Sequence, residues 1–128
     1  MNSQGKAAIV FGIFLVAIVV HYYAVIVPKN IRIQNNHLVI CADILKYEQS
    51  YKVRDMTFRF SYNGREFVFT NQNTSRFVVQ GYKNGKTNVM IVFEKDNPNN
   101  WRMLGDDEDF TYYNIKSEDT LGLKCSFY

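Results

Sequence analysis

The chain contains few of the residues on which enzyme active sites are built. It has two histidines, and because His21 lies in a long apolar segment, His37 is the one imidazole in the polar part of the chain. No Gly-x-Ser-x-Gly elbow, phosphate-binding loop, His-Glu-x-x-His or Cys-x-x-Cys motif is present. The sequence therefore predicts no enzyme, and no cofactor. A net charge of +3 is also too small to indicate nucleic-acid binding by itself.

What the chain does contain is one long apolar run near its amino terminus. Residues 7–27 carry no formal charge and are flanked by Lys6 and Lys29. As a helix this run spans roughly 31 Å, close to the thickness of a bilayer's hydrocarbon core. A core helix would have a polar face, and a signal peptide would have a small-x-small cleavage site, but neither is present. We therefore expect an uncleaved, single-pass anchor over residues 1–28, in contact with lipid through residues 7–27.

The residues at the two ends of the anchor do not determine its orientation in the membrane. His21, Tyr22 and Tyr23 are typical of an aromatic belt at the membrane surface. Basic residues are balanced, with Lys6 and the amino terminus on one flank and two basic residues on the other. The side of the membrane that holds the remaining residues thus stays open, with a slight preference for the extracytoplasmic side.

The remaining residues, 29–128, have the size and composition of one small β domain. Most of the ten Phe and nine Tyr of the chain lie here, together with many β-branched residues. Charge is uneven: residues 46–86 hold eight basic and three acidic residues, and residues 94–119 hold three basic and eight acidic ones. Opposite charges of this kind complement each other within a fold or bind partners.

The densest acidic stretch is the quartet Asp106, Asp107, Glu108 and Asp109. Clustered carboxylates are ligands for hard cations, but this quartet lacks the alternating spacing and the turn glycine of a calcium loop. We therefore expect no metal site.

The clearest local signal is "MTFRFSYNGREFVFT". Asn63-Gly64 suits a two-residue hairpin turn in which both central residues have positive φ. Closing the hairpin there pairs Phe60 with Phe67, and it also pairs Phe58 with Phe69. All four rings then share one face, while Arg59 lies on the other. An aromatic face without charges is a core face, so we expect no nucleic-acid stacking platform.

Further strands complete the predicted domain. Asn84-Gly85 indicates a second hairpin that pairs Val78 with Ile91, and Val89–Phe93 is apolar on both faces, as in a central strand. His37–Tyr47 reads as an earlier strand and Leu121–Phe127 as a closing one. The acidic stretch between them reads as a loop with a short helical turn. At least six strands without an amphipathic helix predict a mainly β domain, an antiparallel barrel or sandwich.

From Val39 to Leu104 the chain resembles a family of bacterial membrane-anchored small β-domains to which no function is assigned. The resemblance implies a fold, a membrane context and a bacterial source, but no reaction. A second span, which many members carry after the domain, is not present in this sequence. The hairpin and strand-turn positions that carry the resemblance are Phe60, Tyr62, Gly64, Phe67, Val89, Ile91, Phe93, Asn97 and Pro98.

Cys41 and Cys125 lie on the first and last predicted strands. Two free thiols packed as small apolar groups are the favoured interpretation. A disulfide between them would stabilise the domain by a few kcal/mol and would require an oxidising compartment. The sequence leaves both states open.

Two functional hypotheses follow from these observations. The first is an accessory or interaction subunit of a membrane-associated protein assembly, and the second is a membrane-held immunity protein that neutralises a toxin. Exposed aromatic residues beside clustered charge are common anchors for a protein partner. The residues expected to bind that partner are Trp101, Asp106, Asp107, Glu108, Asp109 and Phe110.

Overall fold

The computed structural model describes residues 3–123 and 125. The chain divides into two compact units, one that ends at Arg32 and one that begins at Ile33. Helical structure runs from Ser3 to Asn35 and is long and apolar enough to cross a membrane. Its first part, α1 (Ser3–His21), has no buried residue. An apolar surface of this length is costly to expose to water and suits a lipid environment.

A π-helical turn interrupts the α-helical pattern at Tyr22–Ile26, before α2 (Val27–Asn35). The N–H of Val27 donates to the carbonyl of Tyr22, five residues earlier. Pro28 explains the wider turn, because proline has no N–H to donate to Ala24 and its ring crowds that carbonyl. The helix widens for one turn and then continues.

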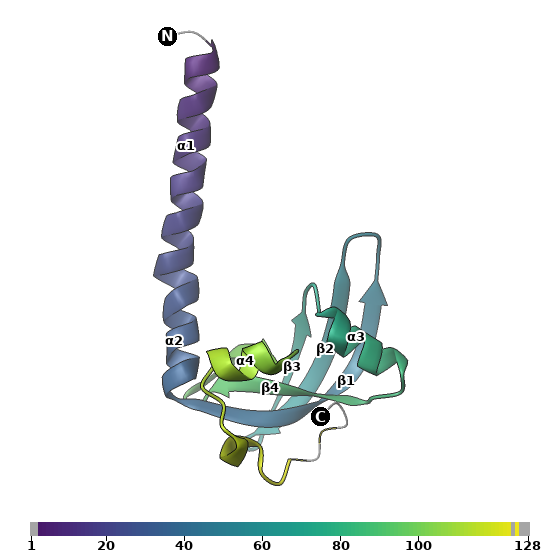
Figure 1. The fold of residues 1–128 in the computed structure, drawn as a ribbon. Coiled ribbons are helices and arrows are strands. Elements are labelled where there is room, and N and C mark those ends of the chain that lie inside the picture. Colours follow the sequence, from purple (N-terminus) through teal and green to yellow (C-terminus); the bar gives the residue numbers. More distant parts are fainter. Residues whose placement is uncertain (1–2, 124, 126–128) are drawn as a thin grey trace. The chain divides into compact units, whose positions relative to one another are not determined.

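The second unit is built on one antiparallel sheet of five strands (Figure 1). Its order is β3-β2-β1-β4-β5, with β1 in the centre. The strands are β1 (His37–Gln49), β2 (Arg54–Tyr62), β3 (Arg65–Asn71), β4 (Asn88–Glu94) and β5 (Asn97–Met103).

The hairpin of β2 and β3 is confirmed in full. Phe58 pairs with Phe69 and Phe60 with Phe67, while Arg59 pairs with Val68 on the other face. Asn63 and Gly64 have φ of 51° and 74°, as the predicted turn requires. The prediction for β4 is also confirmed, since Val89 to Phe93 are all buried and the strand lies between β1 and β5.

The predicted second hairpin is wrong, because Arg76–Lys83 is a helix, α3, instead of a strand. Ile91 pairs with Ile40 and Met103 and not with Val78. The helix begins after Ser75, whose hydroxyl accepts a hydrogen bond from the N–H of Val78 at 3.4 Å. Serine in this position satisfies a backbone donor at the start of a helix.

Asn84-Gly85 ends this helix instead of turning a hairpin. Gly85 has a φ of 97°. The N–H of Lys86 donates to Gly81 and that of Gly85 to Tyr82, both at 3.0 Å. This pair of bonds is the Schellman arrangement, which satisfies the last carbonyls of a helix. It needs a positive φ at Gly85, and the predicted hairpin turn would have needed one there as well.

The carboxyl-terminal part also differs from the prediction. The described residues form five strands where at least six were expected, and Leu121 and Gly122 form a turn instead of a closing strand. The remainder of that predicted strand lies mostly outside the described residues. β5 was not predicted. The short helical turn predicted in the acidic stretch is present as α4 (Asp107–Tyr112), and a 3-10 turn follows at Ser117–Thr120.

One face of the sheet, the aromatic face, holds the main core. Phe58, Phe60 and Phe93 are buried on it, and Val78 of α3 is fully buried against the same cluster. The sheet curls so strongly that its edge strands approach each other. The rings of Phe69 on β3 and Trp101 on β5 stack with centroids 5.4 Å apart. The unit is therefore a curled half-barrel whose edges are joined by side chains.

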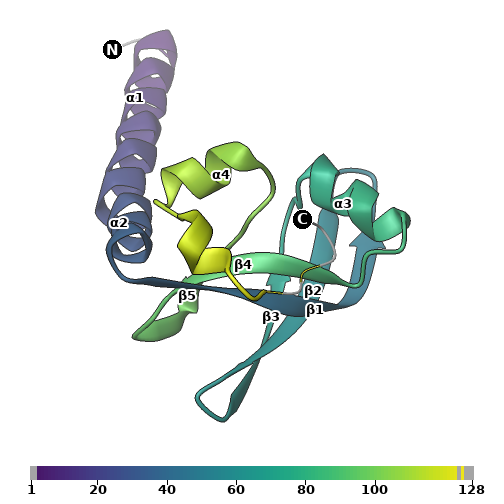
Figure 2. The same ribbon diagram turned by 60° about the horizontal axis from the view of Figure 1, so that its bottom comes forward.

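The opposite face carries a second cluster. Val39, Met90 and Val92 project from the sheet and pack with Ile33 and Leu104. Figure 2 shows α4 and the 3-10 turn lying over β4 and β1 on this side. The apolar residues that the carboxyl-terminal segment contributes are Phe110, Tyr113, Ile115, Leu123 and Cys125.

We expect Phe60→Ala to lower the free energy of unfolding by about 3–5 kcal/mol, because the ring lies 5.3 Å from both Phe67 and Phe93 in the core. Denaturant unfolding of the full chain in detergent measures the loss. Val68→Ala, on the half-exposed outer side of the same hairpin, is the control. Equal stability of Phe60→Ala and wild type would contradict the packing of the aromatic face.

Candidate functional site

Two carboxylates of the predicted acidic site cap their own helix. Asp106 accepts a hydrogen bond from the N–H of Asp109 at 3.2 Å, and Asp109 accepts one from the N–H of Asp106 at 3.3 Å. This reciprocal arrangement is a capping box at the start of α4. Asp107 and Glu108 are thus the two members of the quartet left for an interaction.

Asp107 and Glu108 line a shallow hollow of about 400 Å³ together with Thr111 and Tyr112. Glu108 is exposed, and so is Asp107. The hollow therefore presents two carboxylates beside the ring of Tyr112.

The two aromatic residues of the predicted site lie on different clusters. Trp101 is half-buried on the aromatic face, with its ring 4.8 Å from Phe58 and 5.4 Å from Phe69. Phe110 packs into the cluster on the opposite face. The structure does not bring Trp101 together with α4, and Trp101 joins the two edges of the curled sheet.

A basic cleft, which the sequence did not indicate, lies between α3 and the adjoining ends of β1 and β2. It has a volume of about 310 Å³, and no acidic residue lines it. Figure 1 shows α3 beside these strands. The buried Val79 forms an apolar part of its wall. The polar residues that line it are Tyr47, Gln49, Arg54, Arg76, Gln80 and Lys83.

Helical spacing produces the basic cleft. Arg76, Gln80 and Lys83 are separated by four and then three residues, which places them along one side of a helix. As a strand, the same segment would have placed Arg76 and Lys83 on opposite faces. The cleft was missed because the segment was predicted as a strand, although Ser75 already gave the signal for a helix start.

Arg54 is held firmly in this cleft. Its Nε donates to the carbonyl of Thr74 at 3.0 Å, and the N–H of Thr74 donates back to the carbonyl of Arg54 at 2.9 Å. Thr74 is fully buried. The guanidinium is thus fixed by a buried turn, and its terminal nitrogens keep their donors for another group.

A second cleft, of about 400 Å³, lies at the tips of the two hairpins β2–β3 and β4–β5. Asp96 in its wall accepts a hydrogen bond from Asn36 at 2.9 Å. This cleft carries charges of both signs, unlike the basic cleft. Its lining includes Tyr62, Arg65, Phe67, Lys95, Asp96 and Pro98.

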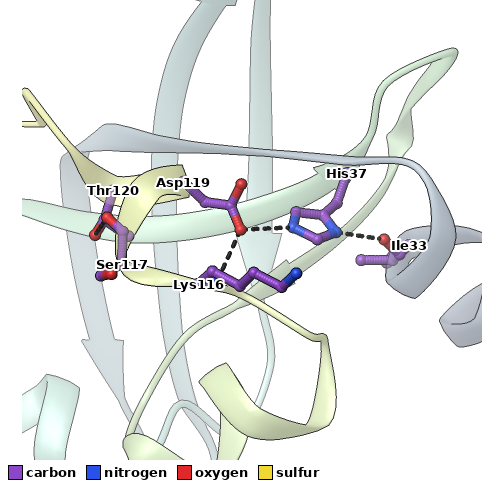
Figure 3. A network of polar contacts seen from close by, with 6 residues as sticks. All are labelled: Ile33, His37, Lys116, Ser117, Asp119 and Thr120. Carbon is purple, nitrogen blue, oxygen red and sulfur yellow. Dashed lines mark hydrogen bonds and ion pairs between the residues drawn. The ribbon is translucent and has the colours of Figure 1, made fainter.

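His37 takes part in a polar network at the start of β1 (Figure 3). Its Nδ1 lies 3.0 Å from the carbonyl of Ile33, and its Nε2 lies 3.3 Å from a carboxylate oxygen of Asp119. Both partners are acceptors, so the protonated ring donates to both whereas the neutral ring donates to one. His37 thereby connects the start of β1 to the carbonyl of Ile33 and to the carboxyl-terminal segment.

Asp119 completes this network. The N–H of Lys116 donates to its carboxylate at 2.7 Å and lowers the pKa of Asp119 below its ordinary value. Burial opposes this effect, and the hydrogen bond and charge of His37 add to it. Asp119 is therefore held in its ionised form and fastens the carboxyl-terminal segment to the start of β1.

A disulfide makes a second connection between these parts of the chain. Cys41 on β1 is bonded to Cys125, and their Cα atoms lie 5.5 Å apart. The favoured sequence interpretation of two free thiols differs from this arrangement. Nothing in the local sequence around either cysteine distinguishes the two states.

The described residues offer little to a chemical reaction. Within residues 3–123 and 125, no three His, Cys, Asp or Glu side chains lie close enough together to hold a metal ion. Burial raises the pKa of Tyr113, which keeps its hydroxyl protonated at neutral pH.

Comparison of the chain with protein-family models, curated proteins and solved structures finds no match. The resemblance to membrane-anchored β-domains stays a prediction.

We expect Asp119→Asn to lower the melting temperature of the full chain more near neutral pH than in acid. A carboxyl group whose pKa is lower in the folded state stabilises the fold above its unfolded pKa of about 3.9. That contribution disappears as the pH falls through the folded pKa. The measurement is thermal unfolding in detergent at about pH 6 and about pH 3.

Glu118→Gln removes the same charge from the neighbouring exposed position and serves as the control. If the difference in melting temperature between Asp119→Asn and wild type were the same at about pH 3 as at about pH 6, the role of the ionised carboxylate would be contradicted.

Proposed function

We propose that this chain is a single-pass membrane protein whose half-barrel acts as an interaction subunit for another membrane-associated protein. The observation that carries the proposal is the apolar helix, in which α1 has no buried residue. Within residues 3–123 and 125, no side chains cover its apolar surface. A bilayer supplies such a cover, and a span of this length fits its hydrocarbon core.

We propose further that the half-barrel lies on the extracytoplasmic side of the membrane. The support is the disulfide between Cys41 and Cys125. Disulfides persist in oxidising compartments and are rare in the cytosol, where thiols are kept reduced. The Cα separation of 5.5 Å also lies within the range that a disulfide needs without backbone movement.

A binding role is supported by the charge that the fold leaves unneutralised. The described ion pairs join His37 to Asp119, Lys46 to Glu48 and Arg59 to Glu66. None of them joins a cation of residues 46–86 to an acid of residues 94–119. Exposed charges of both regions, among them Lys83 and Glu108, can therefore steer and orient a partner of opposite charge.

We expect the intact chain to stay in the membrane pellet after alkaline carbonate washing and to keep its amino-terminal segment. A transmembrane helix resists this treatment, whereas a protein held by charge is released. Fractionation followed by intact-mass measurement checks both points. Release into the supernatant, or a mass that starts near Pro28, would contradict the anchor.

Cysteine alkylation in the same membranes tests on which side the half-barrel lies. Cys41 and Cys125 should resist alkylation by a maleimide until a reductant is added. Immediate alkylation of both cysteines in freshly isolated membranes would contradict the extracytoplasmic placement, while leaving the anchor intact.

We expect Asp107→Asn/Glu108→Gln to weaken capture of the partner from detergent-solubilised membranes, most strongly at low salt, because exposed carboxylates act over a Debye length. Asp106 and Asp109 are left unchanged because they cap α4. The readout is the amount of the partner protein captured by wild type and variant. A toxin as the captured protein would favour the immunity role over the accessory one.

The matched control for this capture is Glu48→Gln/Glu66→Gln, which removes two exposed carboxylates from other parts of the surface. Equal capture by wild type and both variants at all salt concentrations would exclude α4 from the partner site.

A further inference from the structure

The basic cleft has the composition of a binding site for negative charge. Arg54, Arg76 and Lys83 come from β2 and both ends of α3, and the cleft contains no acidic residue. Within the described part of the chain, none of these three cations forms an ion pair. Three cations in one concave site repel one another unless a negative group lies between them.

Donors outnumber acceptors in this cleft. Arg54 uses its Nε on Thr74 and keeps its terminal N–H groups. Tyr47 donates its hydroxyl to Oε1 of Gln49 at 3.2 Å, which leaves the amide N–H₂ of Gln49 as a donor. A ligand that fits must therefore supply acceptor oxygens and negative charge.

The spacing of the cations decides what kind of anion fits. Arg76 and Lys83 are seven positions apart on α3, which corresponds to about 10 Å along a helix axis. A chain that carries negative groups at intervals along its length matches this spacing, and Val79 and the ring of Tyr47 provide apolar contact between the charges.

We propose that the basic cleft binds an extended acidic peptide segment of a partner protein, with carboxylates paired to Arg54, Arg76 and Lys83. This inference rests on the proposed function, because it assigns a peptide as the partner's contact. A nucleic-acid strand also carries regularly spaced charge, but the disulfide favours a compartment outside the cytosol for this unit.

The test uses the full chain in detergent micelles and a fluorescein-labelled peptide of alternating Glu and Ser, whose acidic side chains share one side when it is extended. Fluorescence anisotropy should show binding that a Gln-and-Ser peptide does not reproduce. Arg76→Gln/Lys83→Gln should weaken the affinity about tenfold or more. Unchanged unfolding of the variant would show that its fold is intact.

Arg65→Gln/Lys95→Gln is the matched control, since it removes the same charge from the hairpin-tip cleft. An affinity within about twofold of wild type supports the assignment to the basic cleft. Equal weakening by both double variants would overturn it, because net charge alone would then explain binding.

Competition experiments test whether anions other than a peptide bind the basic cleft. Inorganic phosphate at the same concentration should not displace the peptide, and a single-stranded oligonucleotide should compete poorly. Displacement by phosphate alone, or tighter binding of the oligonucleotide that is lost in Arg76→Gln/Lys83→Gln, would overturn the proposal. Failure of the peptide to bind while partner capture persists would overturn this inference but not the proposed function.

Discussion

Packing of aromatic rings on one face of a single sheet is the interaction on which the rest of the β unit depends. No second sheet is present among the described residues to cover Phe58, Phe60 and Phe93. The sheet covers these rings by curling until Phe69 on one edge stacks on Trp101 on the other. Burying several rings in this way removes a large apolar area from water, which drives the curl.

The curl also determines where the candidate sites lie. Side chains of β3 and β5 join the edges of the sheet, and the amide of Asn71 donates to Sδ of Met103 at 3.5 Å. α3 follows β3 directly and covers the aromatic face through Val78, which turns Arg76 and Lys83 toward Arg54. The basic cleft is thus a result of how the core is closed.

The sequence was informative where two independent constraints agreed and misleading where one signal had two meanings. At Asn63-Gly64, turn chemistry and the alternation of phenylalanines gave the same register. At Asn84-Gly85 the expected positive φ is present at Gly85 but not at Asn84, whose φ is −88°, because a helix end needs it at the glycine alone. Val78 and Val79 favour a strand locally, whereas the cap at Ser75 and burial against the sheet favour the helix.

Other features could not be predicted because their cause is not local. β5 begins with Asn97 and Pro98 and shows no apolar alternation, and proline is tolerated there because β5 is an edge strand. The capping roles of Asp106 and Asp109 matched a helix-start pattern, yet the helix is too short to show periodicity. The basic cleft depends on α3 and could not be found while that segment was taken for a strand.

The central position of β1 has a mechanical consequence. The amino-terminal helix leads into β1, so a force transmitted along the chain from that helix enters the half-barrel at the central strand of the sheet. A load applied along β1 acts on its ladders with β2 and β4 together instead of opening one hydrogen bond at a time. The disulfide at Cys41 and the His37–Asp119 pair also divert part of this load into the carboxyl-terminal segment. A pull on the amino-terminal helix would thus be resisted by two strand ladders and two side-chain connections together.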